Sequence, residues 1–238
     1  MRMAVVVPAY NEAETLGACL AAIQQAITQL PPAVSEVNVL VVLDSCDDQS
    51  VEIVQQAGID YLCCEVRCVG KARDLGVRAM IAKGADWIAC TDADTQVDAQ
   101  WLSAQYAHQP AALICGVVEI KDWSPLSAAA RQKYLRHYQD KMDHRHVHGA
   151  NLSFSAAAYL KAGGFQASSC HEDVQLVEQM QCLNLPIVWS NQVRVTTSSR
   201  LDSRVSDGFA AYLNRLEQAC RAASEVGAIV QKKWLSSG

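Results

Sequence analysis

Residues 87–94 read Trp-Ile-Ala-Cys-Thr-Asp-Ala-Asp, a short apolar run followed directly by two aspartates one residue apart. The apolar run predicts a buried strand over 87–90. Ligands of open α/β sheets gather beyond the carboxyl ends of strands. Asp92 and Asp94 at that place suit a divalent metal held between the protein and a phosphate. An Asp-rich turn after a strand is the alternative, because Asp is common in turns.

The residues before this stretch repeat one arrangement, an apolar strand followed by a polar turn and a helix. Strands are expected over 4–7, 37–43, 59–64 and 87–90. The run 37–43 is apolar throughout, which indicates a parallel strand buried on both faces. Alternating strands and helices with polar strand ends are typical of a doubly wound nucleotide-binding sheet. No glycine-rich dinucleotide loop follows the first strand, which argues against a nicotinamide or flavin enzyme.

The second half of the chain is less regular. Strands are expected over 113–120, up to 154, over 187–189 and over 192–196, and helices over 98–106, 125–142, from 155, over 174–182 and over 207–233. A helix after the first strand is expected to begin at Asn11, with Glu14 closing a capping box. No internal repeat or flexible linker separates the parts, so one domain over 1–238 is expected, with halves 1–95 and 96–238.

Composition limits the class of protein. Of the 238 residues, 50% are hydrophobic and 19% are charged, enough for a large core and unlike a disordered chain. The net charge of -5 argues against nucleic acid as the main partner. The ten cysteines lie mostly in apolar segments, as reduced thiols of cytoplasmic proteins do, so a cytoplasmic location is expected. No apolar run is long enough to predict a membrane span.

The strand-end motifs, taken together and in order, resemble those of family-2 glycosyltransferases with the GT-A fold. The matching segments are Val7–Glu12, Val41–Asp44, Gly70–Asp74, Asp92–Asp94, Gly149–Asn151, Gly163–Phe165 and Glu172–Asp173. The resemblance implies an inverting, metal-dependent transfer of a sugar from a nucleotide sugar, UDP- in preference to GDP-, to a hydroxyl. It implies a small-molecule or carrier-linked acceptor. Residues 1–95 would bind the donor, and residues 96–238 would bind the acceptor and carry the catalytic base.

Several residues take donor-side roles from this resemblance. Asp44 matches the aspartate that reads the base. The surrounding nucleoside pocket would comprise Pro8, Ala9, Asn11 and Glu12. Asp94 and Asp92, with Ala93 between them, match the motif for Mn²⁺ or Mg²⁺, with Asp94 as the direct ligand. Lys71 and Arg73 lie where the family places cations beside the donor; surface charges at a helix N-terminus are the alternative.

The acceptor-side roles come from the same resemblance. Asp173 matches the general base that removes the proton from the acceptor hydroxyl, with Glu172 beside it. Capping of a helix N-terminus is the alternative for this pair. Gly149 and Asn151 would contact the acceptor.

The three histidines 144, 146 and 148 alternate, so an extended segment would place them on one face. His148 is the candidate third metal ligand, since some GT-A enzymes add a histidine, and a solvated loop is the alternative.

The chain also departs from the family pattern. The usual pair of aspartates after the second strand is Leu43-Asp44 here, so one carboxylate is missing. No Gln-x-x-Arg-Trp segment follows, which argues against a processive polysaccharide synthase. Arg200 or Arg204 is expected to reach the diphosphate with bidentate geometry; a basic surface loop is the alternative.

Three other functions remain open at this stage. A retaining GT-A glycosyltransferase would share the donor half and differ at the base. A sugar nucleotidyltransferase would carry a glycine-rich, arginine-bearing loop after the first strand, where Pro-Ala-Tyr-Asn stands over 8–11. A non-catalytic module that binds a nucleotide sugar would lack the base or a metal ligand, and both residue types are present.

Overall fold

A computed structural model describes residues 1–168, 170–201 and 208–235, with side chains described as far as residue 222. The chain forms two compact units. Unit 1 comprises Met1–Glu119 and Asp140–Thr197, and unit 2 comprises Ile120–Gln139 and Ser198–Gly238. This division differs from the expected halves 1–95 and 96–238, because the sheet of unit 1 continues well past residue 95. Among the described residues, no helix has both the length and the apolar character needed to cross a membrane.

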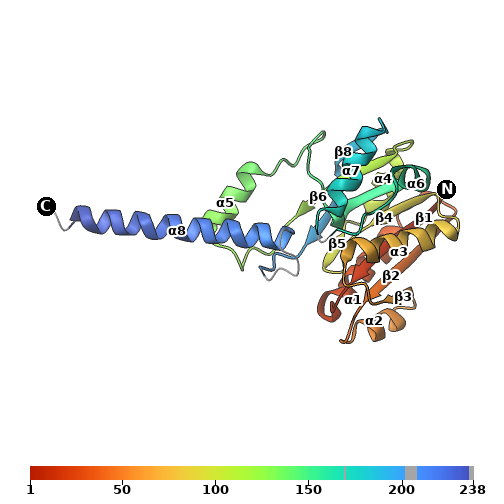
Figure 1. Cartoon of the computed structure of the whole chain (residues 1–238), viewed down its shortest axis with the longest axis horizontal. Coiled ribbons are helices and arrows are strands. Elements are labelled where there is room, and N and C mark those ends of the chain that lie inside the picture. The colour runs from red at the N-terminus through yellow and green to blue at the C-terminus, as the bar shows by residue number, and fades with distance from the viewer. Residues whose placement is uncertain (169, 202–207, 236–238) are drawn as a thin grey trace. The chain divides into compact units, whose positions relative to one another are not determined.

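Unit 1 is built on one mixed sheet, whose described strands run in the order β3-β2-β1-β4-β7-β6-β8-β5 (Figure 1). Its strands are β1 (Arg2–Ala9), β2 (Glu36–Asp44), β3 (Asp60–Cys64), β4 (Trp87–Cys90), β5 (Thr95–Val97), β6 (Leu113–Glu119), β7 (Leu152–Ser155) and β8 (Ile187–Thr197). The first four strands are parallel to one another, as expected. Strand β7 runs antiparallel to both β4 and β6, and β6 is parallel to β8. The α/β class predicted from the sequence is therefore confirmed.

Helices connect these strands and cover the sheet. They are α1 (Ala13–Ile27), α2 (Ser50–Gln56), α3 (Val69–Ala82), α4 (Trp101–Ala107), α6 (Ala156–Ala162) and α7 (Glu172–Cys182). The apolar stripe of α1, with Leu16 and Ile23 fully buried, faces the core as its helical spacing predicts. Helix α3 lies very close to the sheet at Gly76, where a Cβ atom would come within 2.6 Å of Val6. That glycine lets the start of α3, which carries Arg73, approach the strand ends.

Tertiary contacts replace the predicted cap of α1. Asn11 bonds with Asp47, its Nδ2 donating to Oδ1 at 2.5 Å and its Oδ1 accepting from the Asp47 amide at 2.9 Å. The carboxylate that accepts from the Ala13 amide, at 2.9 Å, belongs to Asp48 in the loop after β2. The capping box from Asn11 is therefore wrong, because a residue distant in sequence supplies the acceptor.

Two further differences concern strands. The two short strands expected over 187–189 and 192–196 form a single strand, β8, whose pairing with β6 shifts register between Gly116 and Val117. Strand β5, only three residues long, was not expected, because its pattern is too short to show periodicity.

Unit 2 contains α5 (Ala128–His137) and α8 (Phe209–Leu235). Helix α5 is shorter than the expected 125–142. It begins after Ser127, whose Oγ accepts from the Ala130 amide at 3.2 Å, and it ends where Tyr138 becomes extended. The described core of unit 2 is apolar and aromatic, with Tyr134 buried at its centre beside Leu213 and Leu216.

Candidate active site

The end of β4 brings Asp92 beside a buried arginine. Strand β4 lies between β1 and β7 in the sheet, so the residues after Cys90 emerge in its middle. Asp92 Oδ1 accepts from Arg73 at 2.7 Å, and the Asp92 side chain is 35% exposed while that of Arg73 is 3% exposed. Arg73 comes from the first turns of α3. The guanidinium of Arg73 is enclosed by protein, so the alternative of a surface charge is wrong for this residue, and its expected contact with the donor remains a prediction.

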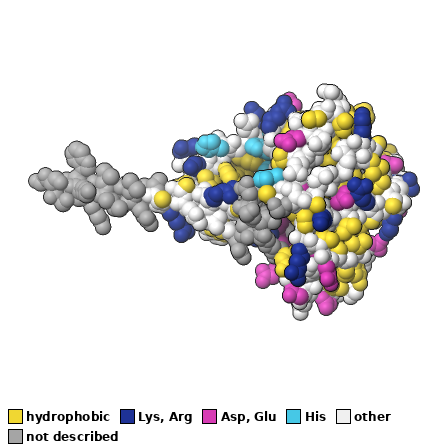
Figure 2. All heavy atoms as spheres, in the orientation of Figure 1, with side chains coloured by type: hydrophobic (Ala, Val, Ile, Leu, Met, Phe, Trp, Pro, Cys, Tyr) yellow, Lys and Arg dark blue, Asp and Glu magenta, His cyan; other side chains and the backbone are white. Residues whose placement is uncertain are grey.

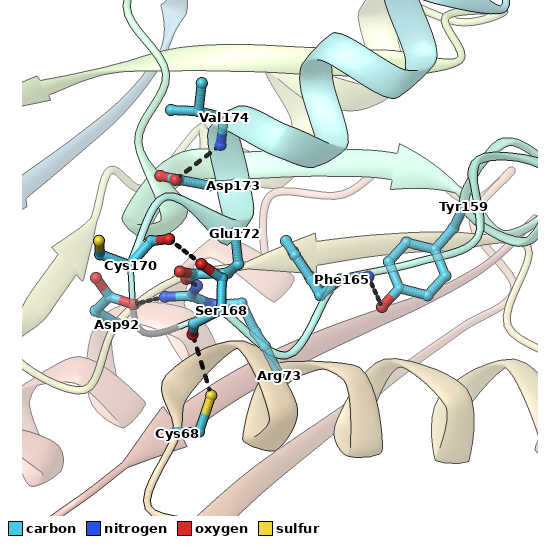
Figure 3. A network of polar contacts seen from close by, with 10 residues as sticks. All are labelled: Cys68, Arg73, Asp92, Tyr159, Phe165, Ser168, Cys170, Glu172, Asp173 and Val174. Carbon is cyan, nitrogen blue, oxygen red and sulfur yellow. Dashed lines mark hydrogen bonds and ion pairs between the residues drawn. The ribbon is translucent and has the colours of Figure 1, made fainter.

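Glu172 pairs with the other side of the same guanidinium (Figure 3). Glu172 is itself buried at the start of α7, so one arginine bridges the end of β4 to the N-terminus of α7. Burial alone would lower the pKa of Arg73, but the charges of Asp92 and Glu172 outweigh it and raise that pKa. The ring of Phe165 lies 5.7 Å from the guanidinium carbon. This bridge fixes Asp92 and α7 relative to one another.

Two motif glycines make room for the bridge. A Cβ atom on Gly149 would lie 2.9 Å from the Arg73 guanidinium, and one on Gly70 would lie 3.0 Å from the Glu172 side chain. The described contact of Gly149 is therefore with Arg73, and its expected contact with an acceptor remains a prediction.

The N-terminus of α7 presents Asp173 next to the buried Glu172. His171, the residue before the helix, has a φ of 62°, and this left-handed backbone turns the chain into α7. Asp173 is partly exposed and its Oδ1 accepts from the Val174 amide at 2.8 Å. Burial raises the pKa of the Cys115 thiol, and the negative charge of Asp173 adds to this rise.

The loop before α7 is tied to the start of α3. The Cys68 thiol donates to the Ser168 carbonyl at 3.2 Å, and the Ser168 hydroxyl donates to the Cys170 carbonyl at 2.5 Å (Figure 3). The Cys68 contact and the Arg73 bridge join the same two segments, and the Ser168 hydrogen bond lies within the loop itself. The position of Asp173 therefore depends on α3, which lies a hundred residues earlier in the chain.

Asp44, the predicted base-reading residue, has the protein's own backbone as its partner. Its carboxylate accepts from the amides of Val66, Arg67 and Cys68 at 2.8, 2.9 and 3.1 Å, and it is only 5% exposed. Asp44 thus holds the loop between β3 and α3 at the strand ends. Reading of a base by Asp44 remains a prediction, and only Oδ2, with one described contact, has capacity left for it.

The remaining donor-side residues lie at the end of β1 or beside it. Pro8 and Ala9 are buried in the last residues of β1. Glu12 is buried, with its amide donating to Ser50 Oγ at 3.1 Å. Ala93 is 2% exposed, and Lys71 is exposed at the start of α3. Their proposed contacts with a nucleoside or diphosphate remain predictions.

Asp94 and Asp92 provide the oxygen donors that suit a metal ion. Asp94 is partly exposed and its Oδ1 accepts from Thr95 Oγ1 at 3.3 Å. Below them, burial and the charges of Asp92, Asp94 and Glu12 raise the pKa of the Cys19 thiol. Negative charge therefore gathers at this strand end and favours a cation. Carboxylate oxygens are ligands that Mg²⁺ and Mn²⁺ prefer.

His148 is not grouped with the two aspartates in the described structure. Within the described parts of the chain, no three His, Cys, Asp or Glu side chains are arranged to hold a metal, and a role of His148 as third ligand remains a prediction. The three histidines do share one face, as their alternation predicts. Ring centroids of His144 and His146 are 5.3 Å apart, and those of His146 and His148 are 5.9 Å apart. Burial and the two neighbouring imidazoles lower the pKa of His148 to about 3.

The side-chain amide of Asn151 bonds to groups of the fold on both of its polar atoms. It lies in a 3-10 turn over Gly149–Asn151 and is 1% exposed. Its Nδ2 donates to the carbonyls of Val117 and Val193 at 2.8 and 2.9 Å, and its Oδ1 accepts from Trp101 Nε1 at 2.9 Å. The amide thus pairs the backbone groups left open where β6 and β8 shift register. The described contacts of Asn151 are therefore with the fold, and its expected contact with an acceptor remains a prediction.

Of the two arginines predicted to contact the diphosphate, the structure describes Arg200. Arg200 belongs to unit 2, where its amide donates to Ser198 Oγ at 3.2 Å. Arg204 lies outside the described residues. Their contact with a diphosphate remains a prediction.

With this geometry established, sequence comparison decides the family. The sequence model described as "Glycosyl transferase family 2" matches residues 4–162, more than half of the chain. The chain belongs to this family. The match includes the ends of β1, β2 and β4, together with Arg73 and Asn151. No curated protein sequence matches the chain.

Solved structures of low sequence identity share the fold of this family member. S. aureus TarS 1-349 in complex with UDP-GlcNAc has a TM-score of 0.67 and 14% identity, covering 88% of this chain and 62% of that chain. The mannosyltransferase PcManGT from Pyrobaculum calidifontis, in complex with GDP-Man and Mn²⁺, has a TM-score of 0.61 and 16% identity. The match covers 94% of this chain and 64% of that chain. This chain therefore spans less than two thirds of the length of either structure.

The sequence did not reveal the pairing of Arg73 with Glu172. The two residues are 99 positions apart. Arg73 lies within the part of the chain that matches the family model and Glu172 lies beyond it, and nothing in the spacing around either residue indicates that they meet. Gly70 and Gly149 are a local signal of this pairing, because a glycine often marks a place where another group lies close to the backbone.

Proposed function

We propose that the protein is an inverting, metal-dependent glycosyltransferase that moves a sugar from a nucleotide sugar to a hydroxyl of a small or carrier-linked acceptor. The observation that carries the proposal is the Arg73 bridge. It holds Asp92, at the end of β4, and the start of α7, with Asp173, in one fixed arrangement. A single displacement requires that the acid on the donor side and the base on the acceptor side are held at fixed positions relative to one another.

Asp173 is proposed as the general base. Its carboxylate is partly exposed, and the contact of Oδ1 with the Val174 amide leaves Oδ2 for the acceptor hydroxyl. As the hydroxyl oxygen bonds to the anomeric carbon, the bond from that carbon to the diphosphate breaks and Asp173 takes the proton. Glu172 does not share this role, because its carboxylate is buried against Arg73. Glu172 is a positioning residue.

Asp94 and Asp92 would hold the metal, with the pairing of Asp92 Oδ1 to Arg73 leaving its second oxygen for this purpose. A bound Mn²⁺ or Mg²⁺ supplies a Lewis acid that stabilises the departing diphosphate. The complex of PcManGT with GDP-Man and Mn²⁺ supports the use of a divalent metal. The complexes of TarS with UDP-GlcNAc and of PcManGT with GDP-Man support a nucleotide-sugar donor, and the preference for UDP over GDP is the part of the proposal that the assay below decides.

The test is a panel of UDP- and GDP-sugars with Mn²⁺ or Mg²⁺, measuring release of the nucleoside diphosphate. Asp94→Asn and Asp173→Asn should each lower turnover by about a hundredfold or more. Asp60→Asn is the matched control, since Asp60 pairs with Lys83 on the surface and should leave turnover unchanged. Unchanged turnover in Asp94→Asn would refute the metal role.

The other candidate functions give different products in the same assay. A product with the anomeric configuration of the donor, seen by NMR, indicates a retaining enzyme. Pyrophosphate released from a nucleoside triphosphate and a sugar phosphate indicates a nucleotidyltransferase. Tight donor binding without any transfer indicates a binding module. A cytoplasmic location remains a prediction.

A further inference from the structure

Charge is divided unequally between the two units. Unit 2 contains ten Lys and Arg residues and five Asp and Glu residues, a net charge of +5. Unit 1 contains ten Lys and Arg residues and twenty Asp and Glu residues, a net charge of -10. The chain's overall charge of -5 therefore conceals a basic unit. A local excess of one sign decides which surfaces that part of a protein approaches.

Helix α5 concentrates part of this positive charge. Arg131, Lys133 and Arg136 lie within six residues, and the helix contains no acidic residue. All three side chains are exposed, and none of them pairs with an acid anywhere in the described chain. Arg131 lies over the ring of Trp123, 5.7 Å from its centroid. Lys, Arg and His side chains gather over the region of α5 in Figure 2.

A large apolar side chain stands among these cations. Leu135 is 56% exposed and lies between Lys133 and Arg136 in the sequence. It is not needed for packing, because α5 uses its other face, with Ala130 and Tyr134, against the core of unit 2. The outer face of α5, defined here as Arg131, Lys133, Leu135 and Arg136, therefore combines exposed hydrocarbon with positive charge that no acid of the described residues pairs.

We propose that this outer face docks unit 2 on an anionic lipid bilayer. Acidic headgroups attract the three cations, and Leu135 enters the boundary between headgroups and acyl chains. A nucleic acid suits the face less well, because a phosphate backbone would contact the cations and leave Leu135 in water. The three cations should strengthen partitioning by about a hundredfold, which corresponds to about 3 kcal/mol.

The test is co-sedimentation of the full chain with vesicles of phosphatidylcholine, and of phosphatidylcholine mixed with phosphatidylglycerol. Binding to the anionic vesicles only, weakening as salt is added, is expected. The triple variant Arg131→Gln, Lys133→Gln and Arg136→Gln should lose about a hundredfold in partitioning. Leu135→Ser should bind more weakly at an unchanged salt dependence. Urea unfolding of each variant establishes that it is folded.

A matched control removes three exposed cations from unit 1, by Arg67→Gln, Lys83→Gln and Lys161→Gln. Equal losses in this control and in the triple variant of α5 would overturn the proposal, as would equal binding to neutral vesicles. A DNA oligonucleotide bound as tightly as the vesicles, with no effect of Leu135→Ser, would also overturn it. All readouts are binding without turnover, so they are independent of the proposed reaction.

Discussion

Replacement of Arg73 by Met should destabilise unit 1 more than the loss of any surface ion pair. The substitution keeps an apolar stem of similar length but removes the cation between two carboxylates. Glu172, 5% exposed, is then left without its partner, and Asp92, at 35% exposure of its side chain, loses its only described ion pair. Removing one partner of a buried pair typically costs about 3–5 kcal/mol, because the remaining charge stays desolvated. We expect a loss in this range.

Urea unfolding followed by circular dichroism measures the free energy of unfolding, and Arg78→Met is the matched control. Arg78 lies on the same helix and pairs with Asp74 at 2.8 Å, but its side chain is 49% exposed. Its loss should cost at most about 1 kcal/mol. The double variant Arg73→Met with Glu172→Met should recover part of the cost, because it leaves no charge at the Glu172 position.

Two results would refute this reasoning. One is a cost for Arg73→Met no larger than that for Arg78→Met. The other is a double variant that is less stable than Arg73→Met alone. That result would show that the buried, unpaired carboxylate of Glu172 is not the cause of the loss. Arg73→Lys adds a further check, since a single ammonium cannot reproduce a guanidinium fork bonded on two sides, so only partial recovery is expected.

Three other predictions follow from single side chains. Asp44→Asn should cost about 2–4 kcal/mol and speed hydrogen exchange of the loop amides, because a carboxamide cannot accept from all three of them; unchanged exchange would contradict the assignment. Gly116→Ala should destabilise, since its Cβ would overlap the Asn151 amide, whereas Gly17→Ala, 3.9 Å from its nearest neighbour, should stabilise by about 0.5–1 kcal/mol. The pKa of His148 is about 3 in the folded state, below its value in the unfolded state. As pH falls from 7, the unfolded state therefore binds a proton first, and the free energy of unfolding decreases. Between pH 7 and 5 the wild type should lose about 2 kcal/mol more than His148→Gln, and parallel losses would refute this.

The predictions that held depended on local physics. Strands β1, β2 and β4 were foreseen to within two residues at either end, because uniformly apolar runs cannot stay in water. The buried stripe of α1 was foreseen from helical spacing. The shared face of the three histidines was foreseen in the same way, because alternation in an extended segment needs no distant partner.

What local patterns could not supply was the identity of partners far along the chain. Asn11 was expected to cap α1, but Asp48 supplies that acceptor. The Asn151 amide pairs backbone groups of β6 and β8, a contact that the sequence did not predict, while its expected contact with an acceptor remains a prediction. In both cases a polar residue type was recognised correctly as a hydrogen-bonding group, and its partner depended on which loops meet at the strand ends.

The sequence by itself determined the α/β layout, the family and the placing of acids at strand ends, because all of these are written in short, contiguous patterns. The two aspartates after β4 were evident from residues 87–94 alone. Only the tertiary structure decided that Arg73 is buried between Asp92 and Glu172, that Asp44 binds a loop of its own chain, and that positive charge collects in one unit. The physical reason is that burial and pairing of a charge depend on which segments the folded chain brings together, and local spacing does not encode those contacts.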